Sequence, residues 1–350
     1  MKFFHLSHTD LDGFGCQFTT LLLFPNAIYY NANYGIEVKM YLKDILEKIE
    51  ETNKNEEIFF LITDLNLTAD ESKNLNKHII NLNENDGYNI TLQLLDHHAT
   101  GQKSADKYDW YYLDTTRSAT KITYDYLCKN YPSFQESIPS NFEQLIQAIN
   151  AVDIWLDNDE LFEFGKVCMS MISKAYEINN ILFNTQSREY KFYLLNKTLE
   201  FVNRTNGHIT LDENIYKLKK EFLNIEKKDD TIDNISSHYL VKSLDNKKEE
   251  LTVYYQGQKG LLTYNLGGIS IPANAFLKAN EDYDFFIDIN RRGRTGFRAN
   301  NKLDVSLLAQ KLAGGGGHPN ASGAAFKDFK ETVLYNDVKK FIQNKLDNCK

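Results

Sequence analysis

Acidic and imidazole side chains of the kind that bind divalent metal occur in four separate stretches of this sequence. Each of the first three stretches follows an apolar run that is typical of a buried strand, so we expect these side chains at one edge of a sheet. The fourth stretch is a single aspartate within a predicted helix. The four stretches are His8-Thr9-Asp10-Leu11-Asp12-Gly13, Asp64, Asp96-His97-His98 and Asp153.

The four stretches supply four carboxylates and three imidazoles, more than one ion with an open coordination position needs. Two like charges about 4 Å apart repel by roughly 4 kcal/mol at an effective dielectric of about 20, so a cluster without cations would be poorly tolerated. Two divalent ions about 3.5–4 Å apart are the arrangement that activates water in phosphoryl hydrolysis. The sequence therefore predicts a two-metal site for phosphodiester hydrolysis.

The ligand types narrow the choice of metal. The candidate ligands are hard oxygens and imidazole nitrogens, and none of the four stretches contains a cysteine. This set favours two Mn²⁺ ions, with Mg²⁺ or Co²⁺ as alternatives, and disfavours a thiolate zinc site.

Length and composition limit the class of protein. The 350 residues are enough for two domains with separate cores, and the four cysteines lack the spacing of a metal site or a disulfide framework. No apolar run approaches the roughly 20 residues of a membrane helix. The formal net charge of -8 disfavours a surface that follows long duplex nucleic acid. We expect a cytoplasmic protein, not associated with membranes, that acts on a small or locally bound substrate.

Predicted strands and helices alternate in the first part of the chain. Near-continuous apolar strands in such an alternation predict the α/β fold class, with an N-terminal parallel sheet flanked by helices. The strands are predicted at 2–7, 27–31, 57–63 and 90–95. The helices are predicted at 13–24, 36–51, 68–83 with a Thr68/Glu71 capping box, and 141–156 with a Ser140/Glu143 capping box.

The rest of the sequence is predicted to form a helical connector and a smaller C-terminal α/β domain. Strands are expected at 239–243, 251–255 and 285–290, and helices at 304–312 and 331–346. The predicted domains are a metal-binding catalytic domain at 1–184, the connector at 185–235 and a substrate-binding domain at 236–350.

A run of four glycines, Gly314 to Gly317, precedes His318. Because glycine carries an entropic penalty within regular structure, we expect this run outside helix and strand interiors. Its backbone N–H groups suit an anion, although a flexible turn without a ligand is the alternative. Residues 285–318 also hold six Lys/Arg against two Asp. The candidate substrate-binding residues of this region are Arg291, Arg294, Arg298, Gly315, Gly316, Gly317 and His318.

These motifs in this order resemble the DHH-family phosphoesterases of the RecJ exonuclease and nanoRNase type, with their C-terminal DHH-associated domain. The resemblance spans nearly the whole chain. His8 to Gly13 resembles the first motif of the family, Asp64 the second, Asp96-His97-His98 the third and Asp153 the fourth. Gly314 to His318, with Ala321-Ser322-Gly323, resembles the GGGGH signature of the C-terminal domain.

The resemblance implies a role for each residue of the predicted metal site. His98 is expected to face the scissile phosphate as a catalytic group, with Asp96 orienting the imidazoles. Arg117 and Ser118 resemble the start of the helix that follows the third motif and are further candidates for substrate binding. Two ligand sets share one bridging aspartate: His8, Asp10 and Asp64 for one ion, and Asp12, Asp64, His97 and Asp153 for the other.

The compact length resembles the nanoRNase side of the family. The resulting hypothesis is a manganese-dependent phosphodiesterase that hydrolyses short oligoribonucleotides to mononucleotides. The alternatives are a phosphodiesterase for cyclic or linear signalling dinucleotides, a phosphatase for 3',5'-bisphosphate nucleotides, and a nucleotide sensor without turnover. Expected partners are short RNA oligonucleotides or dinucleotides, with no long duplex and no membrane. The oligomeric state is open, with a homodimer as one option.

Overall fold

The computed structural model describes residues 1–349, which form two compact units. The first unit contains Met1–Ala175 and Lys191–Ile215. The second contains Tyr176–Tyr190 and the chain from Tyr216 onward.

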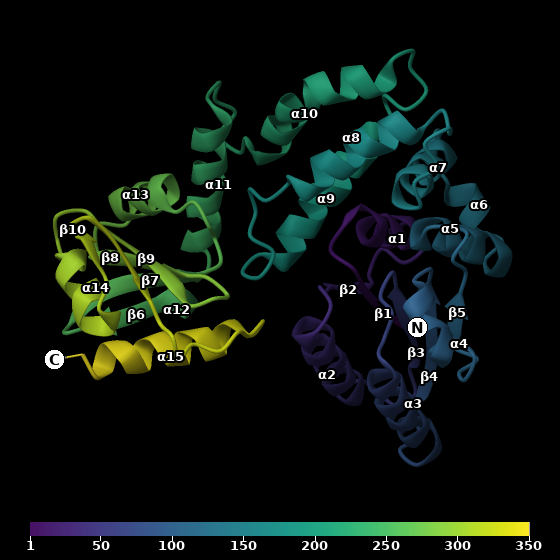
Figure 1. The fold of residues 1–350 in the computed structure, drawn as a ribbon, viewed down its shortest axis with the longest axis horizontal. Coiled ribbons are helices and arrows are strands. Elements are labelled where there is room, and N and C mark those ends of the chain that lie inside the picture. Colours follow the sequence, from purple (N-terminus) through teal and green to yellow (C-terminus); the bar gives the residue numbers. More distant parts are fainter. Residues whose placement is uncertain (350) are drawn as a thin grey trace. The chain divides into compact units, whose positions relative to one another are not determined.

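Two helices carry residues of both units, namely α9 (Asn184–Thr198) and α10 (Gly207–Leu223) (Figure 1). Both fall in the segment that the sequence predicted to be largely helical. Across residues 1–349, no helix has the length and apolar character that a bilayer span requires.

The first unit is built on a five-stranded sheet in which every neighbouring pair of strands is parallel. The strand order is β2-β1-β3-β4-β5, so the direction of winding reverses between β1 and β3. The predicted α/β class and the four predicted strands of this sheet are confirmed, whereas the short strand β5 was not predicted. The strands are β1 (Lys2–Ser7), β2 (Ile28–Asn31), β3 (Glu57–Thr63), β4 (Asn89–Asp96) and β5 (Tyr111–Leu113).

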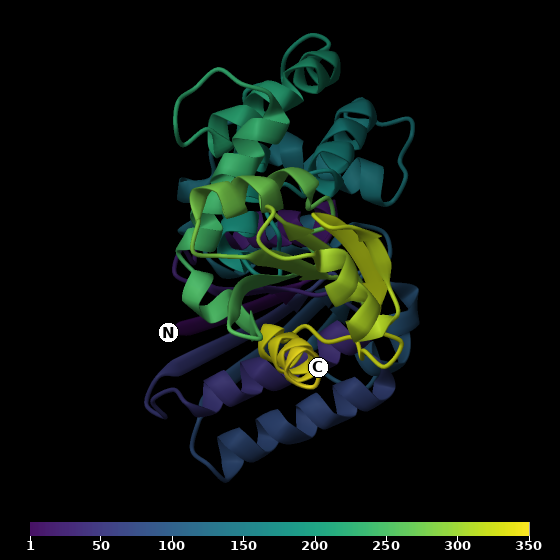
Figure 2. The ribbon, with the colours of Figure 1, turned by 90° about the vertical axis from the view of Figure 1, so that its left-hand side faces the viewer.

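Helices cover both faces of this sheet. On one face, buried side chains of α2 and α3 pack with Phe4, Phe60 and Leu94, and Figure 2 shows these two dark-blue helices side by side. On the other face, Phe3 and Phe59 pack with Ile122 of α5. The helices and the single 3₁₀ turn of this unit are α1 (Leu11–Leu21), α2 (Ile36–Glu50), α3 (Ala69–Glu84), η1 (Ala99–Gly101), α4 (Gln102–Ala105), α5 (Ala119–Asn130), α6 (Phe134–Ser137), α7 (Phe142–Asp153) and α8 (Phe162–Ser173).

Of the two predicted capping boxes, one is confirmed and one is wrong. Thr68 accepts from the backbone N–H of Glu71, whose side chain accepts in return from Thr68. In α7, by contrast, Asn141 is the N-cap, with a left-handed φ of 66° and no side-chain cap bond. The Asn141 side chain instead donates to the backbone carbonyl of Leu199, 2.9 Å away. The Asn141 side chain is thus used for a contact distant in sequence, and the predicted Ser140/Glu143 capping box does not form.

The second unit contains a six-stranded mixed sheet with the order β10-β11-β9-β8-β7-β6. Only β7 and β8 pair in parallel among its described strands. The strands are β6 (Thr252–Tyr255), β7 (Gln258–Tyr264), β8 (Phe285–Ile289), β9 (Arg294–Ala299), β10 (Gly316–His318) and β11 (Ala321–Ala325).

Helices α14 and α15 cover one face of this sheet, where Leu308 and Ile342 pack against Phe297 in one apolar cluster. Helix α13 covers part of the other face, where the rings of Phe276 and Phe286 meet edge to face. The helices are α11 (Ile232–Asp245), α12 (Lys248–Leu251), α13 (Ser270–Ala279), α14 (Val305–Ala313) and α15 (Tyr335–Asp347).

Two expectations for the second unit were wrong. Residues 239–243, predicted as a strand, lie within α11, whose first turn is capped by the Thr231 side chain. The glycine run was expected outside strands, but Gly316 and Gly317 belong to β10. A Cβ on Gly317 would lie 2.6 Å from the Ala321 carbonyl oxygen, so glycine is what allows this edge strand to pair closely with β11.

Candidate active site

The carboxyl ends of three parallel strands bring the first three motifs together. Ser7 and Thr63 are paired in register, and Thr63 is paired with Leu95 on its other side. The next residue after Ser7 is His8, and the next after Thr63 is Asp64. These strand ends flank the point where the sheet reverses its winding, which is where open α/β sheets bind ligands.

The start of α1 fixes the two aspartates of the first motif. Asp10 is the N-cap, and its Oδ1 accepts from the backbone N–H of Gly13 at 3.0 Å. A Cβ on Gly13 would lie 2.4 Å from the His8 carbonyl oxygen, so the motif needs glycine at this position. The helix therefore starts directly against the strand end that carries His8.

The Asp12 carboxylate is fully buried against the first turn of α5. Its Oδ2 accepts from the backbone N–H of Ala119 at 2.7 Å, and its Oδ1 accepts from that of Thr120 at 2.8 Å. These N–H groups have no partner within their own helix, and the helix dipole adds positive potential there. A helix terminus thus orients one carboxylate of the site.

Asp64 lies between the remaining acidic and imidazole groups. Its backbone adopts a left-handed φ of 55°, and only 1% of the residue is exposed. Its Oδ2 lies 3.7 Å from His8 Nδ1, and its Oδ1 lies 3.3 Å from His97 Nε2. Asp64 is the carboxylate that reaches both sides of the cluster.

The structure brings all seven predicted side chains of the metal site together. Within each of three groups, the potential ligand atoms lie within 4.8 Å of one another. Asp153, the last residue of α7, reaches His97 Nε2 with its Oδ2 at 3.5 Å. The groups are His8, Asp10 and Asp64; Asp12, His97 and Asp153; and Asp64, His97 and His98.

As protein groups alone, this cluster is electrostatically unfavourable. Burial and the Asp12 carboxylate raise the pKa of Asp153 to about 9, and burial together with Asp12 and Asp10 raises the pKa of Asp64 well above its usual range. The Oδ2 atoms of Asp64 and Asp153 are buried and lack a hydrogen-bond partner. Buried carboxylates without partners are costly, and divalent cations would satisfy them. The residues present therefore fit a metal centre.

His98 belongs to a separate hydrogen-bonded chain at the border of the cluster. Asp96 is fully buried, and its Oδ1 accepts from His98 Nδ1 at 2.7 Å. Its Oδ2 accepts from the Tyr111 hydroxyl, also at 2.7 Å. Because Nδ1 is engaged by Asp96, the nitrogen of His98 that is left for other partners is Nε2.

In the second unit, four of the substrate-binding candidates lie on one face of the sheet, namely Arg294, Arg298, Gly316 and His318. Thr295, Phe297 and Ala299 point into the core, so Arg294 and Arg298 lie on the opposite face of β9. Arg298 Nη2 donates to the Ser270 hydroxyl at 3.0 Å, which fixes its guanidinium beside α13. The two arginines are therefore carried on rigid strand positions.

On the neighbouring strands β11 and β10, the same face of the sheet is formed largely by small residues. Arg298 is paired with Ala321 on β11, which is paired with His318 on β10. The next row consists of the glycines Gly296, Gly323 and Gly316. A Cβ on Gly316 would meet no atom within 4 Å. Ile269 covers Gly296, but Gly316 and Gly323 are exposed, so the surface beside the row of Arg298 and His318 can admit a flat or anionic group close to the backbone.

Arg291 occupies a different place. It lies before β9, and its Nη1 is 3.3 Å from a carboxylate oxygen of Glu331. Sequence reasoning grouped it with Arg294 and Arg298, but an arginine in the turn does not share the strand face.

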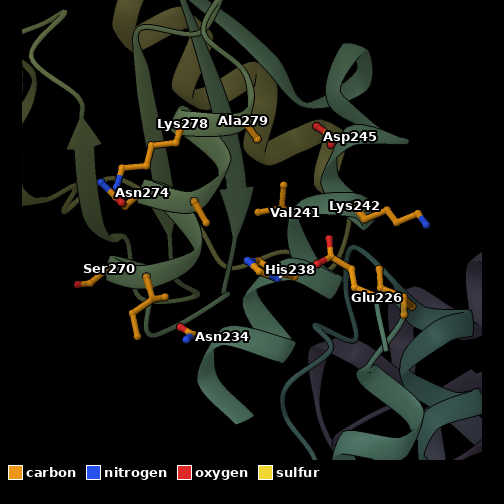
Figure 3. Close-up of a pocket in the computed structure, with 13 residues that line it drawn as sticks. Glu226, Asn234, His238, Val241, Lys242, Asp245, Ser270, Asn274, Lys278 and Ala279 are labelled. Atoms are coloured by element: carbon orange, nitrogen blue, oxygen red, sulfur yellow. Dashed lines mark ion pairs between the residues drawn. The ribbon is translucent and has the colours of Figure 1, made fainter. Parts of the chain in front are cut away.

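A groove of about 970 Å³ lies between α11 and α13 (Figure 3). Ser270, which binds Arg298, is one of its lining residues, so the groove adjoins the face just described. In the close-up His238 and Glu226 point toward one another, and their closest atoms are 3.5 Å apart. Among the lining residues two lysines are matched by Glu226 and Asp245, so the groove has no marked charge.

Known proteins resemble this chain over its full length. No model of a protein family matches the sequence. A 3',5'-cyclic-nucleotide phosphodiesterase of Helicobacter pylori is 41% identical over 349 residues, which is 100% of both chains. The oligoribonuclease NrnB of Bacillus subtilis is 26% identical over 342 residues, 93% of this chain and 73% of NrnB. This chain belongs to the DHH family of phosphoesterases.

A solved structure agrees with this assignment. The crystal structure of an uncharacterized protein from Helicobacter pylori G27 matches with a TM-score of 0.93 and 41% identity, over 99% of each chain. The two named relatives confirm the sequence-based resemblance to DHH phosphoesterases, and the chain is a phosphoric ester hydrolase with phosphodiesterase activity.

Two candidate substrate residues of this DHH phosphoesterase have other partners in the structure. The guanidinium of Arg117 contacts the carboxylates of Asp114 and Asp125. Ser118 is fully buried as the N-cap of α5, where its hydroxyl accepts from the Lys121 backbone N–H. Both residues thus position the helix start that binds Asp12, and contact with substrate stays a prediction for them.

Sequence reasoning missed two tyrosines of the DHH phosphoesterase site. Tyr111 donates to Asp96, and Tyr34 lies beside His98. The available signal was position, because Tyr34 follows β2 and Tyr111 opens β5 in the same sheet. With 21 tyrosines in the chain, residue type alone could not single them out.

Replacing Asp96 by Asn in this DHH phosphoesterase is expected to lower kcat by about 10- to 100-fold. The amide can still accept one hydrogen bond from His98, but the negative charge that supports a protonated imidazole is lost. Steady-state kinetics with bis-p-nitrophenyl phosphate and Mn²⁺ measure this effect. The matched control is Asp44→Asn on α2, which removes a half-buried carboxylate that pairs with Lys48 and belongs to none of the four motifs. Equal kcat values for the two variants would contradict the assigned role of Asp96.

Proposed function

We propose that this DHH phosphoesterase is a manganese-dependent phosphodiesterase that hydrolyses short oligoribonucleotides to mononucleotides. The observation that carries the proposal is the cluster of carboxylates and imidazoles, in which the buried Asp64 lies between two ligand sets. The similarity to an oligoribonuclease supports this choice of substrate.

The residues that would hold two divalent ions are His8, Asp10 and Asp64 on one side, and Asp12, Asp64, His97 and Asp153 on the other. When bound, the ions supply positive charge at the phosphate oxygens and lower the pKa of the attacking water. The other functional groups of the site are protein side chains that the fold orients before the substrate binds. Asp12 is oriented by the first turn of α5, and His98 is oriented by Asp96.

The Nε2 nitrogen of His98, which Asp96 does not bind, is suited to protonate the leaving group. With Asp96 on Nδ1, a protonated His98 presents its second N–H at Nε2, and the nearby carboxylate stabilises that charge. We propose that Nε2 donates its proton to the leaving ribose oxygen as the oxygen of the attacking water bonds to phosphorus and the ester bond breaks, while the water loses one proton to solvent. The proton is then regained from solvent in the next cycle.

The cationic face of the second unit is proposed to bind the distal end of the substrate. Arginine matches phosphate oxygens with two parallel donors, and Arg298 is held in place by Ser270. Beside His318, the exposed Gly316 and Gly323 leave space for a phosphate or a base plane close to the backbone. A small basic face of this kind suits short substrates better than long duplexes, in keeping with the acidic net charge of -8.

A second candidate substrate is a 3',5'-cyclic nucleotide. The specific observation in its favour is the 41% identity over the full length with a phosphodiesterase of that name. The scissile linkage is chemically related, because both substrates join a ribose 3'-oxygen and 5'-oxygen through one phosphorus. A cyclic mononucleotide has no distal end, however, and would leave the Arg298 face without a function.

A substrate panel tests the proposal. Purified protein with Mn²⁺ is incubated with di- to pentaribonucleotides, 3',5'-cyclic mononucleotides, cyclic and linear dinucleotides and 3',5'-bisphosphate nucleotides, and the products are separated by chromatography. Asp64→Asn prepared in parallel controls for contaminating nuclease. Fastest release of mononucleotides from short RNA supports the proposal. Hydrolysis of cyclic mononucleotides with intact RNA would replace it by the second candidate.

Replacing Arg298 by Ala is expected to raise the KM for a pentaribonucleotide by about 10- to 100-fold, because a charge-assisted contact with the distal phosphate is lost. Hydrolysis of bis-p-nitrophenyl phosphate, which has no distal nucleotide, should stay unchanged. The matched control is Lys340→Ala, which removes one exposed positive charge from α15 on the opposite face of the sheet. An equal loss of activity on both substrates would contradict a distal grip.

A further inference from the structure

Tyr34 occupies a place in the site to which no motif or comparison assigns a role. It lies in the loop after β2, and 43% of the residue is exposed. Its hydroxyl is 3.3 Å from Nε2 and 3.5 Å from Nδ1 of His98. The centre of its ring is 5.2 Å from that of His8 and 5.9 Å from that of His98. One aromatic side chain therefore contacts imidazoles from two different motifs.

The loop that carries Tyr34 is anchored to the first motif itself. The backbone N–H of Ala32 donates to the Ser7 carbonyl at 2.9 Å. The hydroxyl of Thr9, inside the motif, donates to Asn33 Oδ1 at 2.7 Å. The backbone N–H of Asn33 donates in turn to the buried Glu37 carboxylate at 2.9 Å. These bonds on both sides of the loop hold Tyr34 at a fixed distance from the strand end.

The chemistry of a phenol suits this position next to His98. Asp96 occupies Nδ1 of His98, so Nε2 is the nitrogen that must meet the substrate. The hydroxyl is almost equally far from both ring nitrogens, so it lies beside the imidazole and not along the single in-plane bonding direction of Nε2, which stays open to the substrate. The His97 ring packs against His98 with its centre 4.3 Å away, and Tyr34 adds a contact from a different element.

We propose that Tyr34 is a positioning residue that keeps Nε2 of His98 directed at the scissile phosphate. It completes a series of contacts in which Tyr111 holds Asp96, Asp96 holds Nδ1 of His98, and the Tyr34 hydroxyl contacts the ring beside both nitrogens. This inference rests on the role given to His98 under the proposed function. It is independent of which nucleotide is the natural substrate.

The first test compares Tyr34→Phe with Tyr88→Phe, using bis-p-nitrophenyl phosphate and Mn²⁺. Tyr88 is a matched control, because its hydroxyl also makes one hydrogen bond, to the Glu50 carbonyl, in the same unit. Tyr34→Phe is expected to lower kcat by about fivefold to tenfold, the size of one lost hydrogen bond, with KM unchanged. Calorimetric titration with Mn²⁺ should give the same stoichiometry and affinity for both variants.

A double-mutant cycle then decides whether Tyr34 acts through His98. In a His98→Ala background, Tyr34→Phe should have no further effect on kcat, because there is no ring left to orient. A full additional loss in that background would overturn the positioning role in favour of direct substrate contact. Wild-type kcat for Tyr34→Phe alone would overturn it as well.

The same cycle separates this inference from the proposed function. If His98→Ala itself retains wild-type kcat, the role of His98 fails, and the role of Tyr34 fails with it. If His98→Ala is slow and Tyr34→Phe is not, only the inference about Tyr34 fails. Ring nitrogen chemical shifts of His98 provide a readout without turnover, and they should change in Tyr34→Phe but not in Tyr88→Phe.

Discussion

Asp64→Asn is expected to reduce phosphodiester hydrolysis on the order of a thousandfold while leaving the fold intact. Asp64 is the carboxylate that reaches both His8 and His97, so its charge serves both proposed ligand sets. Asparagine is the suitable replacement, because it has the same shape and tolerates the left-handed backbone at this position. Product formation from a short oligoribonucleotide and from bis-p-nitrophenyl phosphate measures the loss.

Although Asp64→Asn should lower activity, it should maintain or raise the free energy of unfolding of the metal-free protein. Burial and the Asp12 and Asp10 charges raise the pKa of Asp64, so its ionised form is penalised in the folded protein. A pKa raised on folding means that stability falls as pH rises above the ordinary value of an aspartate. The neutral amide removes this penalty near neutral pH.

In EDTA, urea denaturation of Asp64→Asn should therefore give a free energy of unfolding at least equal to that of the wild type. Asp44→Asn serves as the control in both assays. Near-normal turnover by Asp64→Asn would refute the metal scheme, and a large loss of stability would refute the account of its charge.

Removing metal from the wild-type protein with EDTA should abolish turnover, and added Mn²⁺ should restore it. Cation binding should also stabilise the fold, because the buried carboxylates then gain the partners that they lack. A ligand present at 100 times its Kd contributes about 2.7 kcal/mol for each site, and this appears as a higher denaturation temperature. Calorimetry is expected to find two ions for each chain.

Asp153→Asn separates the two ligand sets in the same measurement. Asp153 belongs to the group with Asp12 and His97, whereas His8 and Asp10 form the other group with Asp64. The variant should keep one ion and lose the other. A wild-type stoichiometry of one ion, or no stabilisation by Mn²⁺, Mg²⁺ or Co²⁺, would contradict a two-metal centre.

The first sheet and its cluster could be predicted because the rules that place them are local. Apolar strands that alternate with helices must run in parallel, so residues that follow each strand meet at one edge. His8, Asp64 and the Asp96-His97-His98 motif satisfy this rule. The strand β3 was predicted with the same ends that the structure has.

The features that escaped prediction depend on contacts distant in sequence. Strand β10 contains two glycines that no propensity favours, and it exists because β11 pairs with it. The partners of Asp12 are backbone groups 107 and 108 residues away, which no motif could reveal. Tyr34 is set beside His98 by a loop whose anchors, Thr9 and Glu37, have no recognisable pattern.

The first turn of α5 has a consequence for how the site responds to substitution. Its bonds to Asp12 come from the main chain at positions 119 and 120, so alanine scanning leaves them intact. Proline is the one natural residue that lacks the donor, and the first position of a helix accepts it without breaking the helix. The hydrogen bonds that hold the Asp12 carboxylate therefore come from the peptide backbone, and most side-chain substitutions around them leave these bonds intact.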